Sequence, residues 1–417
     1  MGWNQYIYLK SLFNCKDSRI DFSKVLSKEL INISYGKVEP KDIKMLSLLK
    51  LFFTLDLGKI KNALEMSNLL ITNFIDRLDH KKLTDCVIED LENLSITRID
   101  SLPRKLTFNI KNVYTSIIDC LPYFKSGLKY QQVVYLIVNL AHYKNIEQSL
   151  YTLICTTTKI NLKKYLALNS SIGLETIFTQ AFNNYTDIIT YSLTHGQTYI
   201  KYKNFRPLDN INGENITSRY VIVWGKRQKQ ELIENFNFSK NRIKIGGNPK
   251  YASEKRDYKT TFRNCLIFLP RETYDSDNYE LLKILSNLID KVRFTIKPHP
   301  SLDVVKYRGI TEQYGYELIE KTSFIIDEIN QGDYDFSITF NSTSYHEAMF
   351  YGLICFRFDR GNDIYIGLND LFKDHYELVD KMNYFKNISQ GQISGEISIL
   401  LEEVLGVGIN SYKKILS

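Results

Sequence analysis

Apolar residues recur at helical spacing through the first third of the chain. Between Phe22 and Leu94 they lie three or four positions apart, which is the period of an amphipathic helix. One such series is Ile71, Phe74, Ile75 and Leu78. The spacing continues through Val113–Leu121 and Gln131–Leu150. The apolar face of the second segment predicts a helix packed into a core, with a membrane-surface helix as the alternative. We therefore expect residues 1–150 to form a helical N-terminal region.

The pattern changes near residue 164, where short apolar runs begin to alternate with helical segments. The runs predict strands at 165–168, 187–193, 220–224 and 243–245, and the segments between them predict helices at 173–183 and 226–236. Strands that alternate with helices form parallel sheets. Residues 151–255 are therefore expected to complete a first Rossmann-like domain, with a polar linker at Tyr251–Asn264.

A second alternating series follows the linker. It predicts strands at 266–269, 292–296, 316–319, 336–340 and 353–358, and helices at 278–289, 323–329 and 344–351. Residues 256–390 are therefore expected to form a second Rossmann-like domain, and residues 391–417 a helical C-terminal tail. The predicted fold class is α/β, with the two domains facing a central cleft. Ligands of open α/β sheets bind beyond the carboxyl ends of the strands.

Cysteine usage and apolar content limit the cellular setting. Six cysteines lie far apart without a C-x-x-C pair, so the sequence predicts neither a zinc site nor a disulfide scaffold. The first residues lack the basic and apolar segments of a secretory signal, and no window approaches the roughly 18 apolar residues of a membrane-spanning helix. We expect a cytoplasmic protein that is soluble or peripheral to a membrane.

The net charge of +7 suggests nucleic-acid or membrane partners. A nucleic-acid-binding protein, however, needs Lys and Arg clustered on one face with aromatic residues, and here they are spread along the chain. Abundant Lys, Asn, Ile and Tyr with few Pro are typical of an A/T-rich coding bias. We therefore expect no nucleic-acid partner.

Three of the six histidines lie at predicted strand-to-helix junctions, where open α/β sheets bind ligands: His195, His299 and His346. His299 stands between Pro298 and Pro300, which restrict the backbone on both sides and hold the histidine in place. The alternative is a structural turn with an incidental histidine. His346 is expected on the surface of its helix.

A segment rich in hydroxyl groups, Asn341-Ser342-Thr343-Ser344, follows a predicted strand and begins a helix. Its hydroxyls and the N–H groups of the helix start predict a phosphate site that needs no metal. We call Ser342–Ser344 the hydroxyl segment. Ser344 and Glu347 also fit a capping box, which leaves Glu347 as either a cap partner or an acceptor for a ribose hydroxyl.

Lys297-Pro298-His299-Pro300, followed further along the chain by the hydroxyl segment and Glu347-Ala348, resembles the C-terminal half of bacterial surface-polysaccharide transferases with the GT-B fold. That group includes the capsule Kdo transferases, the teichoic acid glycerophosphotransferases, and the bacterial sialyl- and polysialyltransferases. The resemblance implies that His299 contacts the donor phosphate and acts as general acid to the departing nucleotide. It also implies that Ser342, Thr343 and Ser344 bind the same phosphate, and we add Lys297 and Glu347 to this donor site.

The first half resembles the same group more loosely, through Thr194-His195-Gly196, Val223-Trp224-Gly225 and Gly247-Asn248-Pro249. The sialyltransferases carry a carboxylate before the glycine as catalytic base, whereas this chain has His195 there, as the glycerophosphate transferases do. We expect His195 to be the base, since a neutral imidazole accepts protons. The alternatives are a histidine that only orients the loop or contacts a substrate, with Asp187 or Glu175 as base. Gly247 and Asn248 are expected to contact the donor, and residues 1–150 the acceptor.

Two D-x-D patterns fit the metal-nucleotide signature of another glycosyltransferase fold. Asp333-Tyr334-Asp335 precedes a predicted strand, at the wrong end for ligands, and predicts a solvated turn. Asp275-Ser276-Asp277 follows Arg271 in a loop at the cleft edge, where Arg271 is expected to reach a donor phosphate.

These expectations combine into a glycosyltransferase of capsule or lipopolysaccharide synthesis that uses a CMP-linked acidic sugar such as sialic acid or Kdo. Its partners are a nucleotide-sugar donor and a glycan or lipid-linked oligosaccharide acceptor, with peripheral contact to the anionic inner face of the plasma membrane. No metal or other cofactor is expected, because hydroxyls, a helix start and one protonated histidine neutralise the leaving phosphate. The alternatives are a UDP- or CDP-linked donor for glycosyl or polyol-phosphate transfer, or an isomerase of the UDP-GlcNAc 2-epimerase type.

Overall fold

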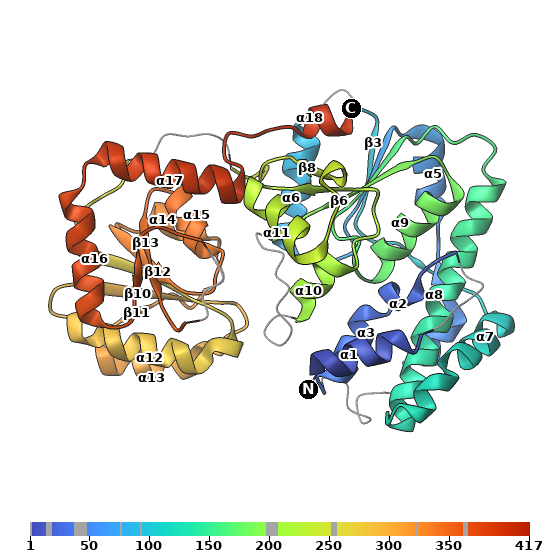
Figure 1. Ribbon diagram of the computed structural model, residues 1–417, viewed down its shortest axis with the longest axis horizontal. Coiled ribbons are helices and arrows are strands. Elements are labelled where there is room, and N and C mark those ends of the chain that lie inside the picture. The colour runs from blue at the N-terminus through green and yellow to red at the C-terminus, as the bar shows by residue number, and fades with distance from the viewer. Residues whose placement is uncertain are drawn as a thin grey trace. The chain divides into compact units, whose positions relative to one another are not determined.

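The protein is described by a computed structural model for residues 2–13, 19–36, 48–75, 77–91, 94–196, 207–251, 257–321, 323–361 and 366–417. It divides into two compact units. The first unit is Met1–Lys250 with Ile409–Ser417, and the second unit is Tyr251–Gly408. The division after Lys250 lies at the start of the predicted linker. Each unit is built on a six-stranded parallel sheet (Figure 1).

The first unit has a sheet whose strands are mostly buried, as expected when helices cover both faces. Its strands lie in the order β3 (Ile96–Ile99), β2 (Leu69–Thr72), β5 (Lys164–Ala167), β6 (Ile189–Leu193), β7 (Tyr220–Val223) and β8 (Ile243–Ile245). All five pairings are parallel. The direction of winding reverses between β2 and β5, which is where a ligand crevice forms in such a sheet.

The prediction of a helical region over residues 1–150 is wrong in two places. Leu69–Thr72 forms β2 with all four residues buried, although the apolar spacing from Ile71 onward favoured a helix. A short buried strand is a continuous apolar run, and periodicity alone does not separate it from a helix. In addition, β1 (Phe53–Leu55) pairs antiparallel with β4 (Arg104–Leu106). Residues 1–150 therefore contribute two strands to the first sheet and a separate two-stranded sheet.

The helices of the first unit surround a large hydrophobic core and, around Leu232, a smaller one. They are α1 (Gly2–Ser11), α2 (Phe22–Val25), α3 (Ser27–Ser34), α5 (Gly58–Met66), α6 (Leu78–Glu89), α7 (Ile110–Cys120), α8 (Tyr130–Thr156), α9 (Gly173–Tyr185), α10 (Pro207–Glu214) and α11 (Lys226–Phe236). The predicted helix Gln131–Leu150 lies within α8. Its residues Leu136, Leu140 and Ile146 are fully buried in the large core, so the core prediction is confirmed.

The second unit contains the five strands that its sequence predicts and one more at its edge, β14, that was not predicted. Its sheet has the order β11 (Glu317–Leu318), β10 (Arg293–Pro298), β9 (Asn264–Leu269), β12 (Phe336–Thr339), β13 (Ile354–Phe358) and β14 (Leu371–Phe372). Figure 1 shows α12 (Asp275–Leu285) and α13 (Val304–Tyr314) on one face, and α14 (Ile325–Gln331) and α15 (Ser344–Phe350) on the other. The winding reverses between β9 and β12, so the crevice of this sheet opens at their carboxyl ends.

The C-terminal segment is helical as predicted, but its two halves serve different units. After α16 (His375–Asn387), α17 (Gln390–Leu405) packs in the second unit, while α18 (Tyr412–Leu416) returns to the first. The buried Tyr412 hydroxyl donates a 2.7 Å hydrogen bond to the Gly247 carbonyl, and Ser411 N–H donates to the Gly246 carbonyl at 3.2 Å. No helix in the described ranges is long and apolar enough to cross a membrane.

His346 does not lie on a helix surface, as the sequence predicted, but is completely buried. Its Nε2 lies 3.0 Å from the carbonyl oxygen of Ile366, to which it donates a hydrogen bond. Burial lowers the pKa of His346 to about 3, because a charged imidazole loses its hydration inside the protein. The residue is therefore part of the core of the second unit.

Acid is expected to destabilise the protein through His346. In the unfolded chain a histidine has a pKa of about 6.5, so below that pH the unfolded state binds the proton and the folded state does not. The free energy of unfolding therefore decreases as the pH is lowered. For this residue the decrease is about 2 kcal/mol at pH 5. Urea unfolding at pH 7.5 and pH 5 should show a smaller pH effect in His346→Gln than in the wild type. His375→Gln, at the start of α16, serves as control; equal pH effects in wild type and His346→Gln would contradict this account.

Candidate functional site

The carboxyl ends of β9, β10 and β12 gather most of the predicted donor residues in the second unit. β9 lies between β10 and β12, and all three strands are parallel. Arg271 follows β9, His299 follows β10 and the hydroxyl segment follows β12. These side chains therefore lie at one edge of one sheet, at the reversal of winding.

His299 is held in a fixed orientation. Its backbone N–H donates to the Leu269 carbonyl at 3.1 Å, which ties the turn to β9. Its Nδ1 accepts a 3.1 Å hydrogen bond from the backbone N–H of Ser301 and lies 2.9 Å from the Ser301 hydroxyl. Because Nδ1 accepts from a backbone N–H, the proton of the neutral ring is on Nε2. His299 therefore presents Nε2–H as a hydrogen-bond donor.

The hydroxyl segment is a compact turn before α15. Asn341 has a positive φ of 44°, a region that Asn tolerates better than most residues. The Ser342 hydroxyl accepts from Ser344 N–H at 3.3 Å and donates to the Ser344 hydroxyl at 2.9 Å. Ser344 is the first residue of the helix, and the N-cap Thr343 makes no side-chain capping bond. The predicted capping box between Ser344 and Glu347 is therefore wrong.

Lys297 and Glu347 bind protein groups. Lys297 Nζ donates to the Ser323 hydroxyl at 2.6 Å and lies 3.9 Å from a Glu328 carboxylate oxygen, and burial lowers its pKa. The Glu347 carboxylate lies 3.4 Å from the Thr343 hydroxyl. Burial raises the pKa of the Tyr251 phenol, and a hydrogen bond to Glu347 raises it further. Glu347 is thus linked to the hydroxyl segment through Thr343.

The two D-x-D patterns are bound into the fold. The Asp275 carboxylate accepts a 2.5 Å hydrogen bond from the Tyr307 hydroxyl. Asp335 is buried and accepts from the backbone N–H groups of Arg263 and Asn264 at 2.9 and 3.1 Å, so the prediction of a solvated turn is wrong for this residue. Within the residues that the structure describes, no group of three His, Cys, Asp or Glu side chains could hold a metal ion.

In the first unit His195 follows β6 and lies against a second histidine. The rings of His195 and His80 are 5.1 Å apart between centroids. His80 belongs to the first turn of α6, which follows β2. Burial lowers the pKa of His195 to about 4, and the Arg77 guanidinium lowers it further while Asp79 opposes the shift. Burial and His195 lower the pKa of His80 to about 3. Both imidazoles are therefore neutral at pH 7.

Three sequence strings that resemble the transferase group meet beside His195. On α11, the Gln228 side chain donates to the Thr194 hydroxyl at 3.4 Å and to the Gly196 carbonyl. The same side chain accepts from Trp224 N–H at 2.7 Å. Gly247 N–H donates to the Trp224 carbonyl at 3.1 Å, and Gly247 has a positive φ of 83°. Thr194–Gly196, the end of β7 and the turn after β8 therefore form one hydrogen-bonded edge.

Buried polar groups without partners mark the same edge. Both polar side-chain atoms of Asn73 and both ring nitrogens of His80 are buried with no hydrogen-bond partner among the described residues. Trp224 Nε1 is also buried and has no hydrogen-bond partner among the described residues. A buried polar group left unpaired costs about 1–3 kcal/mol, so such groups at the carboxyl ends of β2 and β7 indicate a place for a polar ligand.

His80 and its neighbours Arg77 and Asp79 are functional candidates that the sequence reading missed. Arg77 donates two hydrogen bonds to the Asp79 carboxylate, at 3.0 and 2.6 Å. The sequence pattern predicted a helix in this region. No strand end was therefore expected there, and its polar residues were not considered as part of a ligand site. A usable signal existed: the run Leu69–Thr72 lies between Asn68 and Asn73, and Asn at both ends of a short apolar run is typical of a strand.

The alternative bases separate by their position in the sheet. Asp187 precedes β6 and lies at the amino edge, opposite to His195. Glu175 is buried in the first turn of α9 and accepts a 2.8 Å hydrogen bond from Phe74 N–H. Burial raises the pKa of Glu175 to about 7. Glu175 therefore remains as an alternative base, and Asp187 does not.

Asn248, which was expected to contact the donor, is also buried, and its side chain accepts a hydrogen bond from Lys250 N–H at 3.1 Å.

The sequence matches no model of a known protein family and no curated protein. Solved structures do match. A putative UDP-N-acetylglucosamine 2-epimerase from Listeria monocytogenes has a TM-score of 0.50 at 12% identity, covering 84% of this chain and 94% of that one. The wall teichoic acid polymerase TagF, solved with CDPG, has a TM-score of 0.41 at 11% identity, covering 93% and 94%.

TarM is also similar, with a TM-score of 0.40 at 16% identity over 61% of this chain; the chain spans 53% of the length of TarM. At these identities structural likeness establishes the fold alone. The Listeria match covers both of the parallel sheets' units over 84% of this chain. The chain therefore has the α/β, GT-B-like fold of two Rossmann-like domains that its sequence predicts.

Proposed function

We propose that the protein is a glycosyltransferase of capsule or lipopolysaccharide synthesis. It transfers an acidic sugar such as sialic acid or Kdo from a CMP donor to a glycan or lipid-linked oligosaccharide acceptor. The observation that supports this best is the His299 ring, whose Nδ1 is held by Ser301 N–H so that Nε2 carries the proton. That ring lies at the same sheet edge as the hydroxyl segment.

The donor half of the reaction needs groups that neutralise a leaving phosphate. In the protonated His299 ring Nδ1–H donates to the Ser301 hydroxyl at 2.9 Å, and Nε2–H donates to the phosphate oxygen that leaves the anomeric carbon. The Nε2 proton is transferred as the carbon–oxygen bond breaks, and the ring becomes neutral. The Ser344 hydroxyl, which accepts from the Ser342 hydroxyl, and the Thr343 hydroxyl donate to the other phosphate oxygens. Arg271, exposed at the end of β9, is available for a charge-assisted contact. These donors require no metal ion.

The acceptor half needs a base for a sugar hydroxyl. Neutral His195 takes the hydroxyl proton while the acceptor oxygen bonds to the anomeric carbon, and the electron pair of the broken bond goes to the phosphate. His80 packs against this ring from α6.

Nucleotide sugars are cytoplasmic substrates, so we place the protein in the cytoplasm, where its charge of +7 favours the anionic inner face of the membrane.

Nucleotide selectivity tests this proposal. Thermal shifts are to be measured with CMP, CDP, UDP and GDP, and we expect CMP to stabilise the protein most. A ligand at 100 times its Kd adds about 2.7 kcal/mol to the free energy of unfolding. Thr343→Val should reduce the CMP shift because it removes one phosphate donor, whereas Ser286→Ala, at the end of α12, should not.

The alternatives give different outcomes in the same assay. Stabilisation by UDP alone contradicts the CMP donor and indicates a UDP-linked donor or an isomerase of the UDP-GlcNAc 2-epimerase type. Selective stabilisation by CDP indicates polyol-phosphate transfer.

A further inference from the structure

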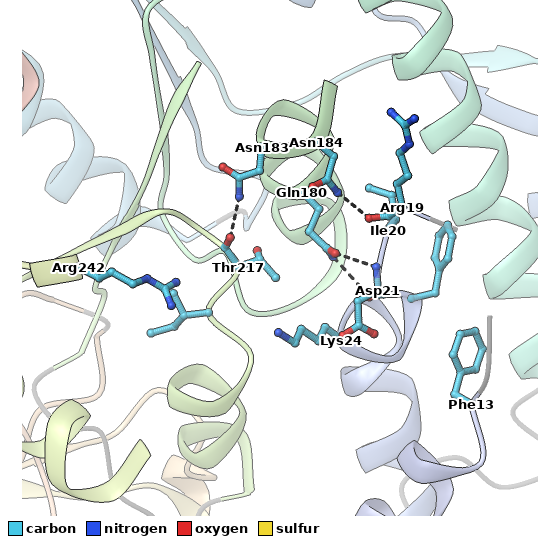
Figure 2. A pocket seen from close by; sticks show the side chains of 12 residues that line it. Phe13, Arg19, Ile20, Asp21, Lys24, Gln180, Asn183, Asn184, Thr217 and Arg242 are labelled. Atoms are coloured by element: carbon cyan, nitrogen blue, oxygen red, sulfur yellow. Dashed lines mark hydrogen bonds between the residues drawn. The ribbon is translucent and has the colours of Figure 1, made fainter. Parts of the chain in front are cut away.

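A pocket of about 550 Å³ opens in the first unit, on the side of the sheet away from His195. Its lining comes from α2, the C-terminal end of α9, the segment before β7 and Arg242 just before β8 (Figure 2). The strands are parallel, so the starts of β7 and β8 mark the amino edge of the sheet, and His195 lies at the carboxyl edge. The pocket is therefore separate from the site of the proposed transfer.

Side-chain amides fix the walls of the pocket. Gln180 Oε1 accepts from Asp21 N–H at 2.7 Å, which ties α9 to α2. Asn183 Nδ2 donates to the Thr217 carbonyl at 2.9 Å, and Asn184 Nδ2 donates to the Arg19 carbonyl at 2.6 Å. Figure 2 shows these amides side by side along α9. The pocket shape is thus set before any ligand enters, which lowers the entropy cost of binding.

Three cationic residues line the pocket, and two of them, Lys24 and Arg242, come from different walls (Figure 2). The third, Arg19, lies over the Tyr185 ring. The Arg242 guanidinium is fixed by donating to the Ser218 and Arg219 carbonyls at 2.8 and 3.1 Å. Lys24 comes from α2. Neither forms an ion pair with an acidic residue in the described ranges. The Asp21 carboxylate in the same lining accepts instead from Ser23 N–H and its hydroxyl at 3.1 and 2.5 Å.

An anionic ligand fits this charge pattern. Burial lowers the pKa of Arg242, which means that its positive charge is partly desolvated without a carboxylate to compensate it. A guanidinium binds carboxylate and phosphate groups with paired hydrogen bonds. The volume of about 550 Å³ is in the range of small-molecule sites and exceeds the needs of one phosphate ion. Phe13 and Phe22 add apolar surface to the lining.

We propose that this pocket binds a saccharide that carries a carboxylate or a phosphate, with Arg242 and Lys24 contacting the anionic group. The site is additional to the transfer chemistry, because no step proposed above uses it. The proposed ligand is a sugar with one anionic group. The experiment below compares a sugar that carries a carboxylate with one that carries a phosphate.

Isothermal titration calorimetry of the full chain tests the proposal. The probes are 3′-sialyllactose, mannose 6-phosphate, lactose and inorganic phosphate. We expect at least one of the two acidic sugars to bind at least 10-fold more tightly than lactose and than phosphate, and the tighter of the two identifies the anionic group. If neither acidic sugar does so, the proposal is wrong. Phosphate binding as tightly as the acidic sugar would show a simple anion site and also overturns it.

Variants locate the binding. Lys24→Gln and Arg242→Gln should each weaken binding of the preferred acidic sugar at least 10-fold, while Lys111→Gln on α7 should leave it unchanged. If Arg242→Gln does not fold because the Arg242 contacts are lost, the result with Lys24→Gln decides the test. Unchanged affinity in Lys24→Gln places the sugar elsewhere and refutes the assignment. Nucleotide-induced thermal shifts should be equal in all these variants, so this test stands or fails independently of the donor site.

Discussion

Replacing His299 with glutamine is expected to lower kcat for transfer from a CMP-sugar by about 10²–10⁴-fold, the contribution typical of one general acid. A glutamine carbonyl can still accept from Ser301 N–H, so the turn after β10 keeps its shape. An amide cannot, however, deliver a proton to the leaving phosphate. Steady-state kinetics with CMP-sialic acid and CMP-Kdo as donors measure the loss.

The division of the effect between kcat and KM separates catalysis from binding. If His299 only binds the donor, its replacement raises KM and leaves kcat near the wild-type value. His375→Gln, a histidine of the same unit that follows β14, two strands away from β12 in the sheet, should retain wild-type kinetics. Full turnover in His299→Gln with a normal fold would refute the assigned role.

The second unit could be predicted closely because five of its six strands lie in short apolar runs bounded by polar or turn residues. β9 and β12 are almost completely buried, and helices separate them at the spacing of β-α-β units. Long-range contacts there agree with the local pattern. His346 is the exception, since the sequence alone does not show which face of α15 packs inward, and tertiary contacts placed the imidazole inside the core.

The first unit was harder because its sheet takes strands from distant parts of the sequence. β2 lies beside β5 although about 90 residues separate them, and the segment between includes β3, β4 and α8. Apolar residues spaced as in Ile71 and Phe74 fit a helix equally well. Missing β2 also hid the reversal of winding, and with it the polar residues that follow the strand.

The candidate site was predicted in part for the same reason. His299, Arg271 and the hydroxyl segment follow strands that the sequence revealed, so their shared edge could be expected. His80 could not, because its approach to His195 depends on the pairing of β2 within the sheet. The predicted capping box at Ser344 was wrong because the helix begins one residue earlier, with Thr343 as its N-cap. Helix ends vary locally with backbone geometry, such as the positive φ of Asn341.

Replacing His195 with glutamine is expected to lower kcat by about 10²–10⁴-fold at pH 7, as for loss of a general base. His142→Gln, on α8 outside this edge, is the control. The pH profile identifies the base more sharply. Since the pKa of His195 is lowered to about 4, the acid limb of the kcat/KM profile in the wild type should lie near pH 4. If Glu175 is the base, the acid limb lies near its pKa of about 7 instead.

Arg77→Gln should move the acid limb of that profile to higher pH. The Arg77 guanidinium lowers the pKa of His195 and His80, and it holds the Asp79 carboxylate in two hydrogen bonds. Its loss removes a positive charge and releases a negative one beside the imidazoles, and both changes favour the protonated ring. Arg98→Gln is the matched control, because Arg98 also pairs with two aspartates, Asp85 and Asp100, but not beside His195. An acid limb that stays in place in Arg77→Gln would show that neither imidazole is the group whose protonation stops the reaction.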